Sequence, residues 1–320
     1  MISIVIPVFN EEENLKELNK RLLAVCKVIG DRYEIIYVND GSSDNSLVLI
    51  KDFCTIDEHL HFISFYRNFG QHAAVMAGFR YASGEIIMTM DADLQNPPEE
   101  IPKFIYKMKE GYDVVAGRRV NREDKLSRKI PSYFMNKFIP LLTGVKLNDY
   151  GCMMRAYSRD IVSKLLRYGD NNLYITAFTS WLSKNTIEIP IKHEPRFAGK
   201  SKYSLLSLLR QVFDIITSYS LVPIQLIGIT GIVFFIVGIF LFLYLMYHRI
   251  FIEHLDPLTT FIAILIFLSG LILFSIGVVS EYMVRIYKEV RNVPLYILKE
   301  SDLNENDISI LDCVDNDNTK

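Results

Sequence analysis

The sequence predicts an α/β domain with a mainly parallel sheet, followed by two transmembrane helices. Over the first 120 residues of the 320-residue chain, short apolar runs alternate with amphipathic stretches, a pattern typical of a parallel sheet covered by helices. Two long uncharged runs follow, from Pro223 to Tyr247 and from Pro257 to Ser280. Each exceeds the roughly 20 residues that cross a bilayer core.

Five apolar runs are expected to form strands because they are short and end in polar turns. They are Ile2 to Val8, Tyr33 to Val38, His61 to Phe65, Glu85 to Met90 and Asp113 to Ala116. Helical patterns between them include Glu12 to Ile29 and Asp44 to Ile56. Ligands of such sheets bind beyond the carboxyl ends of the strands, so the residues that follow each run are candidates for a functional site.

Polar residues begin abruptly at Asp91, after the fourth apolar run. In an extended chain every second residue points the same way, so Asp91, Asp93 and Gln95 are expected to converge three side-chain oxygens on one position. Oxygen ligands suit a hard cation such as Mg²⁺ or Mn²⁺. A polar turn before a helix that starts at Pro97 and Pro98 is the alternative.

The first two strands also end in polar motifs. The first reads Pro7-Val8-Phe9-Asn10-Glu11, and the second reads Asn39-Asp40-Gly41-Ser42-Ser43-Asp44. Asp40 is expected to accept hydrogen bonds from the base or sugar hydroxyls of a ligand. No dinucleotide-binding glycine motif follows the first strand, and the chain has no P-loop. A nucleotide diphosphate held by a metal fits best, which indicates transfer of a sugar from a nucleotide.

The charges around the two uncharged runs predict their orientation. Lys200, Lys202 and Arg210 precede the first, and Arg285, Lys288 and Arg291 follow the second; positively charged flanks stay in the cytoplasm. We therefore expect residues 1–220 as a cytoplasmic domain, 221–284 as the transmembrane region, and 285–320 as a cytoplasmic tail with a disordered end. Stretches 131–143 and 204–220 are expected as interfacial helices, or alternatively as parts of the soluble core.

Composition excludes several classes of protein. The formal net charge of −2 argues against a nucleic-acid partner. Four scattered cysteines, Cys26, Cys54, Cys152 and Cys313, predict neither a disulfide framework nor a zinc site. No basic segment precedes the first apolar run, so a secretory signal peptide is not expected.

Several motifs, taken in order, resemble those of family 2 glycosyltransferases with the GT-A fold, and among them the polyprenyl-phosphate glycosyltransferases. They are Val5 to Glu11, Asn39 to Asp44, Arg67 to His72, Asp91 to Gln95, Asp149 to Tyr157, Lys200 to Ser204, and Glu281 to Tyr287. The sequences of these motifs are most similar to those of the undecaprenyl-phosphate 4-deoxy-4-formamido-L-arabinose transferases. Several long motifs in one order are far more specific than any one of them.

The resemblance implies a role for individual residues. Nucleotide binding is implied for Pro7, Glu11, Asp40 and Asp91, and binding of Mg²⁺ or Mn²⁺ for Asp91, Asp93 and Gln95. Catalysis is implied for Asp149 and Asp93, with Asp149 at the position of the family's proposed base. Arg118, Arg128, Ser132, Arg196 and Lys202 would hold the lipid phosphate or the donor diphosphate.

The implied activity is inverting transfer of a sugar from a UDP-sugar to undecaprenyl phosphate, at the bacterial inner membrane with the catalytic domain facing the cytoplasm. The implied sugar is 4-deoxy-4-formamido-L-arabinose, for lipid A modification and antibiotic resistance. Gly117 to Asn121 is more similar to glucosyl-type relatives, so glucose or an N-acetylhexosamine stays open. A homo-oligomer and a non-catalytic membrane protein that binds a nucleotide sugar are also left open.

The acceptor's chemistry leaves two roles for Asp149. A phosphate monoester has a second pKa of about 6, so at neutral pH it is already mostly an anionic nucleophile. Asp149 therefore need not act as a strong base, and the alternative is that it orients a basic residue. Two other enzymes are alternatives. A processive polysaccharide synthase would carry a Gln-x-x-Arg-Trp motif, which is absent from the sequence. A dolichol-phosphate mannose synthase analogue that uses GDP-mannose would be distinguished by a nucleotide competition assay.

Overall fold

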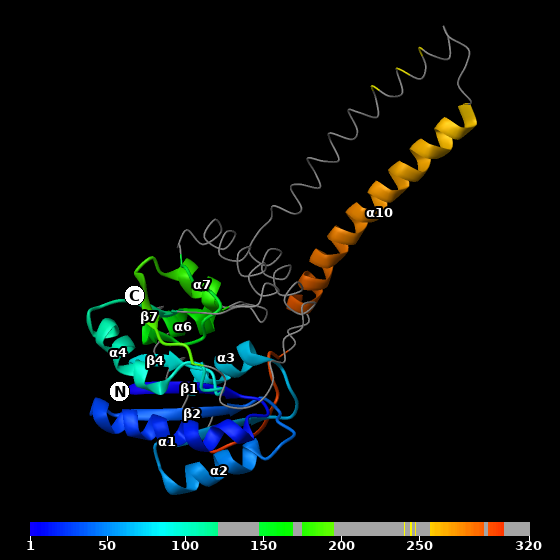
Figure 1. Ribbon diagram of the computed structural model, residues 1–320. Helices are drawn as coiled ribbons and strands as arrows, with labels where there is room; N and C mark the ends of the chain where they lie inside the picture. The colour runs from blue at the N-terminus through cyan, green and yellow to red at the C-terminus, as the bar shows by residue number, and fades with distance from the viewer. Residues whose placement is uncertain are drawn as a thin grey trace, which may run out of the picture. The chain divides into compact units, whose positions relative to one another are not determined.

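The computed structural model describes residues 1–120, 147–168, 175–194, 257–290 and 294–303, together with residues 240, 244 and 247. The chain forms two compact units, Met1–Val212 with Pro294–Lys320, and Phe213–Val293. The second unit contains the long helix α10 (Pro257–Val290), orange in Figure 1. Within the described residues, no helix combines the length and hydropathy needed to cross a membrane.

Several sequence-based expectations fall on other parts of the chain. Arg128, Ser132, Arg196 and Lys202, the stretches 131–143 and 204–220, and the end of the tail lie outside the described residues. The first uncharged run is described at residues 240, 244 and 247 alone.

The described strands of the first unit form one eight-stranded sheet in the order β7-β5-β6-β4-β1-β2-β3-β8. Strands β1 (Ile2–Val8), β2 (Tyr33–Asn39), β3 (Leu60–Phe65) and β4 (Ile86–Thr89) are parallel, as are β5 (Val114–Arg119) and β7 (Thr186–Ile191). Strand β6 (Arg155–Ser158) runs antiparallel to β4 and β5, and β8 (Leu298–Ser301) antiparallel to β3. The prediction of an α/β domain with a mainly parallel sheet is confirmed.

Helices connect the parallel strands and cover the sheet (Figure 1). The helices after β1, β2 and β3 are α1 (Glu12–Ile29), α2 (Ser46–Ile56) and α3 (Gln71–Tyr81). The short 3-10 turn η1 (Pro98–Glu100) leads into α4 (Ile101–Lys109), so a helix does begin at the paired prolines. Helix α6 (Arg159–Tyr168) contacts α3 and α7 (Ile175–Leu182).

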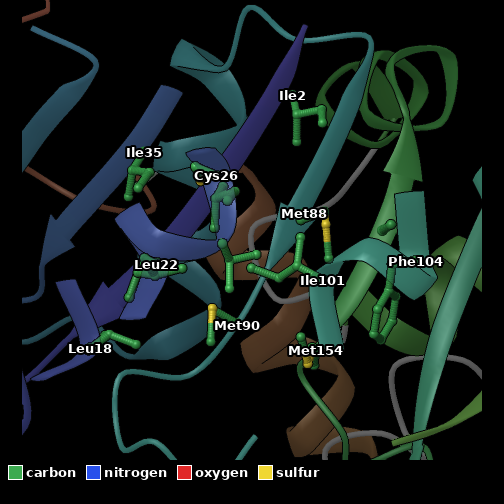
Figure 2. Packing of buried hydrophobic residues seen from close by; sticks show 14 of the residues in the cluster. Ile2, Leu18, Leu22, Cys26, Ile35, Met88, Met90, Ile101, Phe104 and Met154 are labelled. Carbon is green, nitrogen blue, oxygen red and sulfur yellow. The ribbon is translucent and has the colours of Figure 1, made fainter. Parts of the chain in front are cut away.

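Strand β1 is buried on both faces, which explains why six of its seven residues are apolar and only Ser3 is polar. On one face Ile4 belongs to a core cluster with Leu22 of α1 and Phe104 of α4; Figure 2 shows the last two on opposite sides of this cluster, with Ile101 between them. On the other face α3 packs so tightly that a Cβ at Gly78 would lie 2.2 Å from Val5 Cγ1. Glycine at this position therefore sets the distance between helix and strand.

The order of the strands defines where a ligand binds. Strands β1 and β4 are neighbours in the sheet, although β2 and β3 separate them in the sequence. The direction in which successive strands are added therefore reverses between β1 and β4. Open α/β sheets bind ligands at such a switch point, beyond the carboxyl ends of the strands.

After α10, the chain returns to the sheet of the first unit. Strand β8 pairs with the edge of β3, and the Tyr296 ring stacks on Phe65 with centroids 4.8 Å apart. Lys51 Nζ lies 2.6 Å from Glu300 Oε2. Part of the segment expected as a tail is thus an edge strand of the sheet, a strand that the sequence analysis does not predict.

Candidate functional site

The carboxyl ends of β2, β1 and β4 lie side by side at one edge of the sheet. The main-chain N–H of Asp40 donates to Val8 O at 2.8 Å, and that of Met90 donates to Val5 O at 3.2 Å. The structure therefore brings together the three polar motifs that follow these strands, as expected for parallel neighbours.

Short polar side chains tie the loop after β1 to the loop after β2. Asn10 has a φ of 53°, a left-handed conformation that asparagine adopts more readily than most residues. Its N–H donates to Ser42 Oγ at 3.0 Å, and its Oδ1 accepts from Ser43 N at 2.7 Å. Glu11 follows Asn10 in this anchored loop, Pro7 lies near the end of β1, and contact of either residue with a nucleotide stays a prediction.

The carboxylate of Asp40, which is 3% exposed, holds the turn before α3. Oδ1 accepts from Phe69 N at 2.7 Å, and Oδ2 accepts from Gly70 N and Asn68 Nδ2, both at 2.9 Å. Burial raises the pKa of this carboxyl, and the two main-chain donors partly offset the rise. Both oxygens therefore hold this turn, and contact of Asp40 with a nucleotide stays a prediction.

The first residue of α3 reaches the carboxylate that follows β4. Gln71 Nε2 donates to Asp91 Oδ1 at 2.5 Å. Because the two preceding residues donate to Asp40, the N-terminus of α3 joins the motifs after β2 and β4. The partially positive end of a helix also favours a nearby carboxylate. Gln71 is a site residue to which the sequence analysis assigns no role, although it lies in one of the recognised motifs.

The expected metal motif is a turn and not an extended strand. Strand β4 ends at Thr89, Leu94 has a φ of 60°, and Asp93 Oδ1 accepts from Gln95 N at 3.2 Å. The expectation that Asp91, Asp93 and Gln95 alternate along extended chain is therefore wrong, because the left-handed leucine redirects the chain before Gln95. Left-handed backbone is uncommon for leucine, and such strain clusters at functional sites.

Two carboxylates on this turn, those of Asp91 and Asp93, fit a divalent cation. Within the described residues, no group of three or more His, Cys, Asp or Glu side chains could hold a metal ion by itself. Mg²⁺ is usually bound by one or two carboxylates, with substrate phosphates and waters as its other ligands. The donor set therefore suits a hard cation, Mg²⁺ or Mn²⁺, that is shared with a diphosphate.

Arg119 and Asp149 form a bidentate ion pair near this turn. Arg119 Nε lies 2.7 Å from Asp149 Oδ2, Nη2 lies 2.8 Å from Oδ1, and the two side chains are 13% and 8% exposed. Burial lowers the pKa of Arg119, but the hydrogen bonds and charge of Asp149, with a smaller effect of Asp91, raise it overall. The guanidinium therefore stays charged within electrostatic reach of the metal motif.

Arg119 is a candidate site residue that the sequence patterns do not single out. The resemblance points to Arg118, but adjacent residues on a strand face opposite sides. Arg118 is exposed, whereas Arg119 turns toward Asp149. The choice between adjacent arginines depends on a contact across 30 positions of sequence, which no local pattern predicts. With both carboxylate oxygens engaged, Asp149 is better placed to orient a cation than to accept a proton.

The remaining predicted phosphate ligands, Arg128, Ser132, Arg196 and Lys202, lie outside the described residues. The described segment 175–194 ends shortly before Arg196 and Lys202. The N–H of Glu194 donates to Gln95 O at 2.8 Å, and Glu194 Oε2 lies 3.5 Å from Arg21 Nη1. Glu194 is thereby fixed beside the metal motif, two positions before Arg196.

The described cysteines do not contribute a nucleophile. Cys26, Cys54 and Cys152 are not in disulfides. Burial raises the pKa of each thiol to about 12. The thiols therefore stay protonated at neutral pH, whereas a nucleophilic cysteine needs a lowered pKa.

Sequence comparison finds a family and close relatives. Residues 3–166 match the family described as Glycosyl transferase family 2. The chain is 41% identical over 303 residues, 93% of both chains, to the undecaprenyl-phosphate 4-deoxy-4-formamido-L-arabinose transferase of Proteus mirabilis. The protein of the same name from Photorhabdus laumondii is 40% identical over 303 residues, again 93% of both chains.

Structural comparison agrees with the fold. Glucosyl-3-phosphoglycerate synthase from Mycobacterium tuberculosis, solved with Mn²⁺, uridine diphosphate and glucosyl-3-phosphoglycerate, matches with a TM-score of 0.52. The match covers 68% of this chain and 80% of that chain at 16% identity, so it speaks for the GT-A fold alone. The family match over residues 3–166 and the 41% identity over 93% of the chain show that this protein belongs to glycosyl transferase family 2.

Proposed function

We propose that this glycosyltransferase moves 4-deoxy-4-formamido-L-arabinose from a UDP-linked donor to undecaprenyl phosphate, with inversion at the anomeric carbon. The observation that carries the proposal is the arrangement of charge: the carboxylates of Asp91 and Asp93 share one edge of the sheet with the buried Arg119–Asp149 pair. A cation site beside a fixed guanidinium is complementary to two substrates that both bear phosphate. The 41% identity to the P. mirabilis transferase supports this sugar and this acceptor.

The donor would bind across the ends of β1, β2 and β4. Asp91 and Asp93 would hold Mg²⁺ or Mn²⁺, with the Gln95 side chain as a predicted third ligand. When bound, the cation supplies Lewis-acid stabilisation of the charge that develops on the leaving UDP. Pro7 near the end of β1 and Glu11 in the loop after it would contact the nucleotide, and Asp40 would support the nucleotide pocket by fixing the turn before α3.

The acceptor phosphate would approach the anomeric carbon from the side opposite the diphosphate. One of its oxygens forms the new bond to carbon while the bond between that carbon and the UDP oxygen breaks. No proton has to leave a dianionic phosphate, so Asp149 serves by holding Arg119 in place. Arg119, with the predicted ligands Arg118, Arg128, Ser132, Arg196 and Lys202, would offset the repulsion between two anionic substrates.

We also propose a multi-pass location in the bacterial inner membrane, with the catalytic unit in the cytoplasm. The first 24 residues of α10, Pro257 to Ser280, carry no charge, and a lipid-linked acceptor lies in a membrane. The positive flanks of the two uncharged runs favour a cytoplasmic catalytic unit. Ten large apolar side chains of α10 are exposed: Leu258, Phe261, Leu265, Leu268, Ile272, Ile276, Val279, Met283, Ile286 and Tyr287.

Mass spectrometry of the lipid products tests this function. The full chain, purified in detergent, is incubated with undecaprenyl phosphate, Mg²⁺ or Mn²⁺, and one of three donors: UDP-4-deoxy-4-formamido-L-arabinose, UDP-glucose or UDP-N-acetylglucosamine. We expect a lipid phosphate that carries the formamido-arabinose mass, and no product with EDTA or with the Asp91→Asn variant.

The other outcomes are distinct. A glucosyl or N-acetylhexosaminyl product would confirm the proposed type of reaction and show that the transferred sugar is a different one. Absence of product with every donor, from a protein that still binds UDP, would contradict the proposed enzyme and leave a protein that binds nucleotide sugars.

A further inference from the structure

Charged side chains from three strands hold Asp149. Its carboxylate accepts from Arg119 of β5, its main-chain N–H donates to Glu188 Oε1 of β7 at 2.9 Å, and its carbonyl accepts from Arg155 Nη2 of β6 at 3.3 Å. Main chain and side chain are thus fixed independently. The orientation of the Arg119–Asp149 pair therefore depends on Glu188 and Arg155 as well as on the pair itself.

The Glu188 carboxylate accepts hydrogen bonds from the turn that carries Asp149. Its carboxylate also accepts from Asn148 N at 2.7 Å and from Asn148 Nδ2 at 2.6 Å. Three N–H groups from two consecutive residues therefore converge on one carboxylate, and hydrogen bonds to an ionised acceptor are roughly twice as strong as neutral ones. Among the ion pairs of the described residues, Glu188 takes part in none.

Arg155 holds the same turn from the buried side. Its side chain is 0% exposed, and Nε donates to Cys152 O at 2.9 Å. Nη1 has no hydrogen-bond partner, and the described residues provide no carboxylate that pairs with Arg155. A buried guanidinium without a counter-ion lowers stability, and a hydrophobic residue of similar volume would avoid this loss. Its contacts with the turn give it a role in positioning Asp149.

We infer that Glu188 is a positioning residue for transfer: with Asn148 and Arg155, it fixes Asp149 and so aims the Arg119 guanidinium at the phosphate groups of the substrates. This inference rests on the proposed function, because it assigns Arg119 to phosphate. Displacement of a positioned group by about 1 Å lowers a rate by roughly 100-fold. Loss of the Glu188 carboxylate should therefore reduce turnover without a direct contact between Glu188 and substrate.

An exchange of the two side chains provides the test. In Glu188→Gln the charged acceptor of three N–H groups becomes a neutral amide, whose nitrogen can pair with Asn148 only after the Asn148 amide flips, and in Asn148→Asp two carboxylates face each other. We expect each single variant to lower kcat/KM for the lipid phosphate by roughly 10- to 100-fold. The double variant restores one amide and one carboxylate with the roles reversed, and should recover kcat/KM to within about threefold of the wild type.

Two controls separate positioning from general damage. Glu110→Gln removes a carboxylate that pairs with Lys107 at the end of α4, and should leave kcat/KM unchanged. The Kd of UDP should be the same in all variants, because the nucleotide would bind at β1 and β2 and not at β7. If Glu188 had a merely structural role, Glu188→Gln would lower both Tm and UDP affinity. The double variant would then not restore one of these two quantities without the other.

Hydrogen exchange gives a readout that does not depend on the reaction. The amides of Asn148 and Asp149 should exchange faster in Glu188→Gln and recover their protection in the double variant. If the wild type forms no product while exchange follows this pattern, the proposed function fails and the anchoring of the turn stands. Wild-type exchange and wild-type kcat/KM in Glu188→Gln, or a double variant no better than the singles, would overturn the inference.

Discussion

Arg119 donates two hydrogen bonds to Asp149, Nε to Oδ2 at 2.7 Å and Nη2 to Oδ1 at 2.8 Å, at a site where both side chains are largely buried. A carboxylate with both oxygens on a guanidinium is stabilised in its charged form and is a weak base. An acceptor phosphate that is already anionic needs no strong base. The pair is therefore better suited to placing positive charge than to moving a proton.

Replacement of Arg119 by lysine should lower kcat/KM by roughly 100-fold, because an ammonium cannot reproduce the bidentate contact that fixes the charge. Arg118→Lys is the matched control: the same change on the adjacent, exposed residue should lower kcat/KM by less than about 10-fold. Initial rates at varied lipid phosphate measure both. Equal losses in the two variants would show that the Asp149 contact does not select between the arginines.

The carboxylate of Asp91 should control metal-dependent binding of the nucleotide. Titration calorimetry of UDP with and without Mn²⁺ should show tighter binding with the metal in the wild type, and the same Kd in both conditions for Asp91→Asn. Removal of metal with EDTA should make the wild type resemble the variant. A variant that keeps the full metal effect would mean that Asp91 is not a ligand. Asp52→Asn, on the exposed side of α2, controls for the change in charge.

The return of the chain as β8 should stabilise the site from a distance. Tyr296 stacks on Phe65, which packs edge-on against Phe69 with centroids 5.8 Å apart, and Phe69 N donates to Asp40. Tyr296→Ala should lower the free energy of unfolding of the first unit by about 1–2 kcal/mol and speed hydrogen exchange at the Phe69 amide. Urea denaturation and exchange measure the two effects.

Ile297→Ala is the comparison for this prediction, since Ile297 is 49% exposed and its side chain should contribute little. An unchanged Phe69 amide in Tyr296→Ala would show that the aromatic contacts do not reach the Asp40 turn.

Local patterns predict the elements of the sheet that are buried on both faces. The apolar run from Ile2 to Val8 and the helix from Glu12 to Ile29 lie where expected, because burial of β1 on both faces favours apolar residues at nearly every position. Strand β8 is not predicted. Its four residues, Leu298 to Ser301, include two charged side chains, and their pairing with β3 is a contact across more than 200 residues.

Sequence patterns predict which motifs meet at one edge of the sheet, but not the details of backbone and register there. The motifs after β1, β2 and β4 meet as parallel topology requires. The left-handed Leu94 is not predictable, because leucine rarely adopts that conformation outside a folded context that imposes it. The pairing of Arg119 with Asp149, like the support from Glu188, depends on the register of β5, β6 and β7, which is set by tertiary packing.

The pH dependence of single-turnover transfer by wild type and Asp149→Asn separates a positioning role of Asp149 from a role as base. We expect the variant to be slower by roughly 10-fold, since one oxygen still accepts from Arg119, and Asp91→Ala to be slower by at least about 1,000-fold. Both the wild type and Asp149→Asn should lose rate as pH falls through about 6, where the lipid phosphate gains a proton. Loss of this acidic limb in Asp149→Asn, or a loss of rate equal to that of Asp91→Ala in a folded protein, would rule out the positioning role and make Asp149 the base.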